Sequence, residues 1–134
     1  MNNASGIVLR CGAHYQFTVD KCDTWKDAKI VCSAGGWTSN RAPALLRPLV
    51  KAAEKNRRFP SANWFELIGF VGNECKLIRI GCRGCGWSYR ADRDGQFYAF
   101  ANDLCRKYGN NSGCITLTVT RLPQAAKPLP TCQR

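Results

Sequence analysis

Residues 94–120 have the sequence DGQFYAFANDLCRKYGNNSGCITLTVT, and the fold class predicted for the chain depends mainly on this segment. Asp94 is a suitable N-cap for a helix, and Gly109 suits the C′ position that ends one. Between them, apolar side chains recur at helical spacing: Phe97, Phe100, Ala101, Leu104 and Tyr108. The spacing predicts a helix over this segment.

A strand is predicted directly after this helix, at residues 114–120. Ile115, Leu117 and Val119 alternate there with threonines, which indicates a strand with one buried and one solvent-exposed face. Apolar runs bounded by turn signals predict four other strands, at residues 7–11, 64–71, 75–80 and 87–90. The second and third of these flank the turn signal Gly72-Asn73 and predict a β-hairpin.

Two more helices are expected in the N-terminal half. One covers residues 25–32, capped by Asp23 or Thr24 and stopped by two glycines. The other begins near Leu46, because Pro48 is tolerated only in the first turn of a helix.

Together these elements predict an α+β fold. Helices that alternate with an antiparallel hairpin favour a two-layer sandwich, with one antiparallel sheet of about four strands, helices on one of its faces, and disulfide staples. The 134 residues are expected to form a single domain, 1–134. Residues 1–6 are predicted to be disordered or added for expression, and residues 123–134 to be an extended C-terminal arm. No apolar run is long enough to span a membrane.

Nine cysteines in a chain of this length indicate an oxidising compartment. Because the number is odd, at most four disulfides form and one thiol remains, and the pairing stays open. The possible glycosylation sites Asn3-Ala4-Ser5 and Asn110-Asn111-Ser112 fit secretion. Since no signal peptide is visible, a secreted protein requires that a signal was removed and that Met1 was added. The cysteines are Cys11, Cys22, Cys32, Cys75, Cys82, Cys85, Cys105, Cys114 and Cys132.

A formal net charge of +11 favours an acidic partner. Two regions are densest in cations. The helix after Pro48 carries Arg47, Lys51, Lys55, Arg57 and Arg58 against Glu54 alone, and four arginines lie between residues 79 and 93. The candidate partner-binding residues are therefore Arg57, Arg58, Arg79, Arg83, Arg90 and Arg93.

Catalytic and metal functions are expected to be absent. His14 is the only histidine, and no nucleophile elbow or phosphate-binding loop is present. A site that folding alone assembles from His14, Glu66 and an arginine stays open as the alternative. Cys82-Arg83-Gly84-Cys85 is a single C-x-x-C pair, and a structural zinc site normally needs two. No catalytic residue, cofactor site or metal ligand is therefore assigned.

Parts of the chain resemble secreted fungal proteins. Asp94-Gly95-Gln96-Phe97-Tyr98, the segment 104–108 and Ser112-Gly113-Cys114 look like a cysteine-bearing helix and strand in the virus-encoded killer toxins of smut fungi. Residues 81–86 resemble a turn in another toxin of that group. In size, cysteine content and expected architecture the chain is similar to the LARS avirulence proteins of Dothideomycetes. The resemblance implies a killer-toxin-like α/β sandwich and a secreted, non-enzymatic effector.

Three functions follow as hypotheses. The first is an effector that binds a host protein or an anionic host surface, outside or inside the host cell, and that plant immune receptors recognise directly or indirectly, or whose recognition it suppresses. The second is a killer-toxin-like antimicrobial or cytotoxic protein. The third is a zinc-containing nucleic-acid-binding module, although nucleic acid is not the expected partner. The protein is expected to be a monomer.

Overall fold

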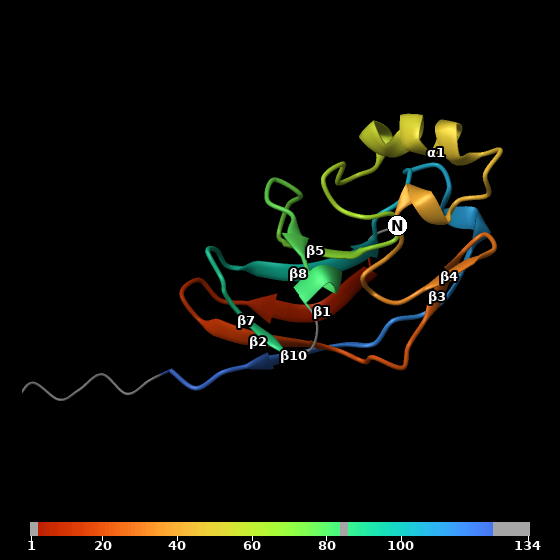
Figure 1. Ribbon diagram of the computed structural model, residues 1–134. Coiled ribbons are helices and arrows are strands. Elements are labelled where there is room, and N and C mark those ends of the chain that lie inside the picture. The colour runs from red at the N-terminus through yellow and green to blue at the C-terminus, as the bar shows by residue number, and fades with distance from the viewer. Residues whose placement is uncertain (1–2, 84–85, 125–134) are drawn as a thin grey trace, which may run out of the picture.

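Ten antiparallel strands dominate residues 3–83 and 86–124, which are the parts of the chain that the computed structural model describes (Figure 1). They are β1 (Asn3–Leu9), β2 (His14–Val19), β3 (Trp25–Asp27), β4 (Ile30–Cys32), β5 (Leu67–Val71), β6 (Ile78–Arg79), β7 (Trp87–Arg90), β8 (Gly95–Ala101), β9 (Asn111–Gly113) and β10 (Leu117–Arg121). The described residues also contain α1 (Arg47–Ala53) and the short 3₁₀ turns η1 (Ser39–Arg41), η2 (Glu54–Asn56), η3 (Gly81–Arg83) and η4 (Tyr108–Asn110).

The main core lies between two sheets. One has the strand order β1-β8-β5-β6 and the other the order β10-β2-β7. Their facing side chains form one buried cluster that includes Leu9, Phe17, Val71 and Phe97. The third sheet, β4-β3-β9, lies toward the end of the molecule that carries α1 (Figure 1). The architecture is therefore a β-sandwich with a small additional sheet, and the predicted α+β sandwich with helices on one face of a sheet is wrong.

The helix predicted after Asp94 is a strand, β8. It lies inside the four-stranded sheet, paired on one side with β1 and on the other with β5. Phe97 faces the core between the sheets, where its ring lies 5.3 Å from that of Phe17. Phe100 belongs to a second cluster with Phe70, on the other face. Because both faces of β8 are covered, its apolar residues do not alternate, and their spacing imitates that of a helix.

The helix predicted over residues 25–32 is also wrong, because this segment forms the β3–β4 hairpin. Its turn contains Ala28, whose φ of 50° is left-handed. On its other edge β3 pairs with β9, so that Asp27 lies directly opposite Asn111. The partner strand comes from a distant part of the sequence, and this pairing outweighs the local helical pattern.

Other expectations are confirmed. β5 and β6 form the predicted antiparallel hairpin, β7 covers residues 87–90, and β10 overlaps the predicted C-terminal strand at residues 117–120. The regular turns of α1 begin at Arg47, with Pro48 in its first turn. Strand β1 begins at Asn3, within the segment 1–6 expected to lie outside the fold.

The predicted disulfide staples are wrong for the described part of the chain. Seven cysteines there carry free thiols: Cys11, Cys22, Cys32, Cys75, Cys82, Cys105 and Cys114. Cys85, Cys132 and residues 125–134 of the predicted arm lie outside the described residues. Aromatic packing joins the layers instead, as in the ring contact between Phe17 and Phe97. None of the helices in the described ranges combines the length and the apolar character needed to cross a bilayer.

Candidate functional site

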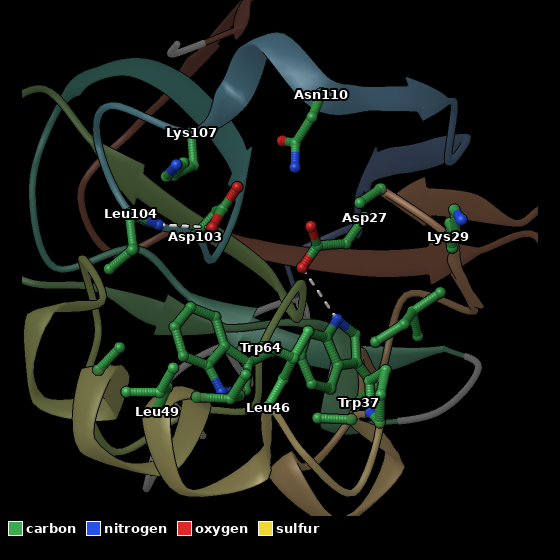
Figure 2. Close-up of a pocket in the computed structure, with 16 residues that line it drawn as sticks. Asp27, Lys29, Trp37, Leu46, Leu49, Trp64, Asp103, Leu104, Lys107 and Asn110 are labelled. Atoms are coloured by element: carbon green, nitrogen blue, oxygen red, sulfur yellow. Dashed lines mark hydrogen bonds between the residues drawn. The ribbon is translucent and has the colours of Figure 1, made fainter.

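A cavity of about 600 Å³ opens beneath α1, between this helix, the β3–β4 hairpin and residues 103–110 (Figure 2). Its floor is apolar and its far side is polar. Figure 2 shows Leu46, Leu49 and the two tryptophans in its lower part. The upper part holds two aspartates and an asparagine, together with Leu104 and two lysines. An apolar cavity with a few convergent polar groups is the usual form of a ligand site.

Trp37 and Trp64 form the floor of this cavity. Their rings stack with centroids 5.6 Å apart, and their backbones pair in an isolated β-bridge. The indole Nε1 of Trp64 donates to Ser39 Oγ at 3.2 Å, and that of Trp37 donates to Asp27 Oδ2, also at 3.2 Å. Both indoles are therefore held in place before any ligand arrives.

Asp27 reaches the cavity from the end of β3. Its half-buried carboxylate accepts the hydrogen bond from Trp37 on one side. On the other side, the register of β3 and β9 places Asn111 directly across from it. Residues opposite each other in an antiparallel pair point their side chains to the same face, so Asp27 and Asn111 are neighbours on one face of the β3–β9 pair.

Asp103 is the second carboxylate of the cavity, and it is buried. Its Oδ1 accepts from the backbone N–H of Leu104 at 2.7 Å, and its Oδ2 accepts from Asn111 Nδ2 at 3.2 Å. The preceding residue, Asn102, is 0% exposed and anchors this segment to the loop at residues 59–63. The position of Asp103 is thus set by hydrogen bonds on both sides of it.

The two carboxylates repel each other. Burial raises the pKa of Asp27 to about 6, with a further contribution from the negative charge of Asp103, while the hydrogen bond from Trp37 opposes the rise. Figure 2 shows Asp27, Asp103 and Asn110 directed toward the same space. Two carboxylates held this close together favour a positive charge between them.

The oxygen atoms of this cluster fit a hard cation. Asn111 Oδ1 is fully buried, yet it has no hydrogen-bond partner among the described residues, although its own Nδ2 contacts Asp103. A buried acceptor without a donor is costly unless something else satisfies it. Asp27, Asp103 and Asn110 line the cavity and supply oxygen ligands of the kind that Ca²⁺ prefers, and Asn111 contacts Asp103 without lining the cavity itself. No group of three or more His, Cys, Asp or Glu side chains that could hold a metal ion occurs in residues 3–83 and 86–124, so amide oxygens would have to complete a cation site here.

The six predicted partner-binding arginines do not form one surface. Arg57 is buried, lies over the Trp64 ring at 4.9 Å and donates to Pro60 O, so it supports the cavity floor from behind. Arg58 lies over the Phe100 ring and forms an ion pair with Glu74. Arg79 makes two hydrogen bonds to the buried Glu66, at 2.8 and 2.7 Å.

The remaining three arginines are Arg83, Arg90 and Arg93. Arg83 is exposed and stacks over the Trp87 ring at 5.0 Å, and Arg90 is exposed on β7 opposite His14. Arg93 bonds to Asp92 and Asn73. Of the six, Arg83 and Arg90 are the two exposed ones.

Sequence reasoning missed the cavity. Asp27 and Asp103 were assigned to helices, and Asn110 and Asn111 were considered only as part of a glycosylation motif. A signal was present, since Asn102-Asp103 and Asn110-Asn111 place five side-chain oxygens within ten residues of a segment rich in turn formers. Asp27 had no such signal. Searches against protein-family models and curated proteins returned no match to this chain.

Proposed function

We propose that this protein is a binding module that takes a saccharide in the α1 cavity through a bound calcium ion. The observation that carries the proposal is the convergence of Asp27, Asp103 and Asn110 beside a floor of two fixed tryptophans. Asn111, whose Oδ1 has no hydrogen-bond partner among the described residues, contacts Asp103 from outside the cavity lining. Calcium accepts oxygen ligands in variable number, so protein ligands from one side leave positions for hydroxyl groups of a ligand.

The tryptophan floor supports a sugar as the occupant. One face of a pyranose ring presents C–H groups and its edge presents hydroxyls, so the ring can rest on an indole while its hydroxyls reach the cation. The apolar and polar halves of this cavity match that division. An organic cation would also fit a pair of carboxylates near an indole. Lys29 and Lys107, both exposed and lining the cavity, repel an organic cation and a calcium ion alike, so the choice between them rests on the oxygen ligands and on the experiments below.

The proposal is tested first with calcium alone. Protein stripped with EDTA and dialysed is titrated with CaCl₂ in a calorimeter, and we expect one site with a dissociation constant between about 10⁻⁵ and 10⁻³ M, typical of sites with few carboxylates. Asp103→Asn should weaken this binding at least tenfold. Asp20→Asn, an exposed aspartate on the loop after β2, is the matched control and should change it less than twofold.

The sugar is tested by tryptophan fluorescence, because Trp37 and Trp64 line the cavity. Methyl glycosides of the common hexoses and of fucose are titrated in calcium and in EDTA. At least one should shift the emission in calcium and none in EDTA. Binding of an alkylammonium compound in EDTA, without any sugar response, would contradict the proposal and assign the cavity to organic cations.

A pH dependence follows from the raised pKa of Asp27, about 6 in the folded protein against an ordinary value near 3.8. The folded state binds this proton more tightly than the unfolded state does. In calcium-free buffer, this group therefore favours folding below about pH 4 and loses that contribution as the pH rises through 6. Calcium needs the ionised form, so its affinity should fall as the pH drops below 6. Asp27→Asn should flatten the melting-temperature profile between pH 4 and 7.

The effector and toxin hypotheses stay predictions. A saccharide-binding module is compatible with a secreted protein that binds a host surface, and it needs no disulfides. Plant-cell and microbial-growth assays, compared between the unmodified protein and Asp103→Asn, test whether any biological activity depends on the cavity.

A further inference from the structure

The surface of α1 and the segment before it combines exposed leucines with exposed cations. Leu45 is 92% exposed, Leu49 69% and Leu46 51%, and these are the three most exposed large hydrophobic side chains among the described residues. They lie within five consecutive residues. Large apolar side chains gathered in this way on a protein surface indicate an interaction site.

The charge around these leucines is positive. Arg41, Arg47, Lys51 and Lys55 are all exposed. Within residues 38–58, all of which the structure describes, Glu54 is the only acidic residue, and it is half-buried and accepts a hydrogen bond from Ser39. Lys29 and Lys107, on the rim of the cavity, extend the positive surface beyond α1.

We propose that this α1 surface docks on an anionic lipid bilayer, with the leucines inserted among the lipids and the cations against the headgroups. Apolar side chains ringed by lysine and arginine are the usual means of interfacial binding, whose strength depends on buried apolar area and on attraction to anionic lipid. Figure 1 shows α1 at one extremity of the molecule, clear of the sheets, where a flat surface can reach it.

A second copy of the chain is a poorer occupant. A two-fold contact through α1 would bring Arg47, Lys51 and Lys55 of each copy against the same cations of the other, without acidic residues to neutralise them. A bilayer that contains phosphatidylserine supplies the negative charge that this surface lacks. Leu46 and Leu49 also line the cavity, so docking would bring its mouth to the level of the headgroups.

The experiment is flotation with vesicles of phosphatidylcholine, with and without 30% phosphatidylserine, in EDTA and low salt. EDTA separates this inference from the calcium site, since lipid binding should persist when that site is empty. We expect at least tenfold stronger binding to the anionic vesicles, and a large loss at high salt. Leu45→Ser avoids the cavity and should weaken binding about tenfold, and Lys51→Glu/Lys55→Glu should weaken it further.

Two controls are matched to these variants. Val8→Ser removes an exposed apolar side chain on β1, and Arg90→Glu/Arg121→Glu makes the same change in net charge on β7 and β10. Each should change binding less than threefold, with unaltered melting temperatures for all variants. Binding that needs calcium, binding reduced equally by the controls, or a dimer that Leu45→Ser dissociates would each overturn the inference.

Discussion

Replacing Phe97 with alanine is expected to lower the free energy of unfolding by about 3–5 kcal/mol, the usual cost of removing a buried phenylalanine. Phe97 is 1% exposed, contacts the Phe17 ring and lies in the core between the two main sheets. A small domain has about 5–15 kcal/mol of stability in all, so the variant should lose much of its resistance to urea. Val31→Ala, at an exposed position on β4, is the control and should cost less than 1 kcal/mol.

A double-mutant cycle then distinguishes strand from helix. In β8, Phe97 and Phe100 lie on opposite faces and in different clusters. Phe97→Leu and Phe100→Leu should therefore be additive within about 0.5 kcal/mol. On one face of a helix the two side chains would be neighbours and their effects would couple. A coupling energy above 1 kcal/mol would contradict the strand.

Asn102→Asp is expected to cost about 3 kcal/mol or more at neutral pH, although the two side chains have nearly the same shape. Asn102 Oδ1 accepts from the Phe59 N–H at 2.9 Å. Its Nδ2 donates to the carbonyls of Phe59, Ala62 and Asn63. A carboxylate keeps the first bond but turns the others into contacts between oxygens, in a place where water cannot solvate the charge.

This cost should fall as the pH is lowered, because a protonated carboxylic acid can donate to one of the carbonyls. The folded-state pKa of the new group would be raised, so its penalty is smallest at acid pH and grows as the pH rises. Calcium binding should weaken too, since Asn102 positions the adjacent Asp103. Asn40→Asp, at an exposed position, is the control for the added charge. Equal stability of N102D and N40D at pH 7 would contradict the anchoring role.

Cations that are neighbours in the sequence occupy different environments in the folded protein. Of the cations predicted on the helix after Pro48, Arg47 and Lys51 remain exposed, while Arg57 is buried against Trp64 and Arg58 covers Phe100. A guanidinium can stack on an aromatic ring and become partly buried with its charge. A basic residue in the sequence is therefore not always available to bind a partner.

Local elements whose sequence pattern allows one interpretation can be predicted without the structure. Pro48 placed the start of α1, Gly72-Asn73 marked the turn region of the β5–β6 hairpin, and alternating threonines marked β10. The sequence also determined the positive charge, which does not depend on how the chain folds. These features are set by neighbours along the chain or by composition, so no tertiary contact is needed to infer them.

The strand conformation of β8 and the existence of the cavity depend on contacts between distant parts of the chain. A central strand with both faces covered loses the alternation that identifies strands, so its identity depends on β1 and β5. Asp27 and Asn111 meet because β3 pairs with β9, 84 positions away, and Asp103 joins them through the side chain of Asn111. Such pairings cannot be predicted from local sequence, because the free energy that stabilises them comes from contacts that exist only after the sheets have formed.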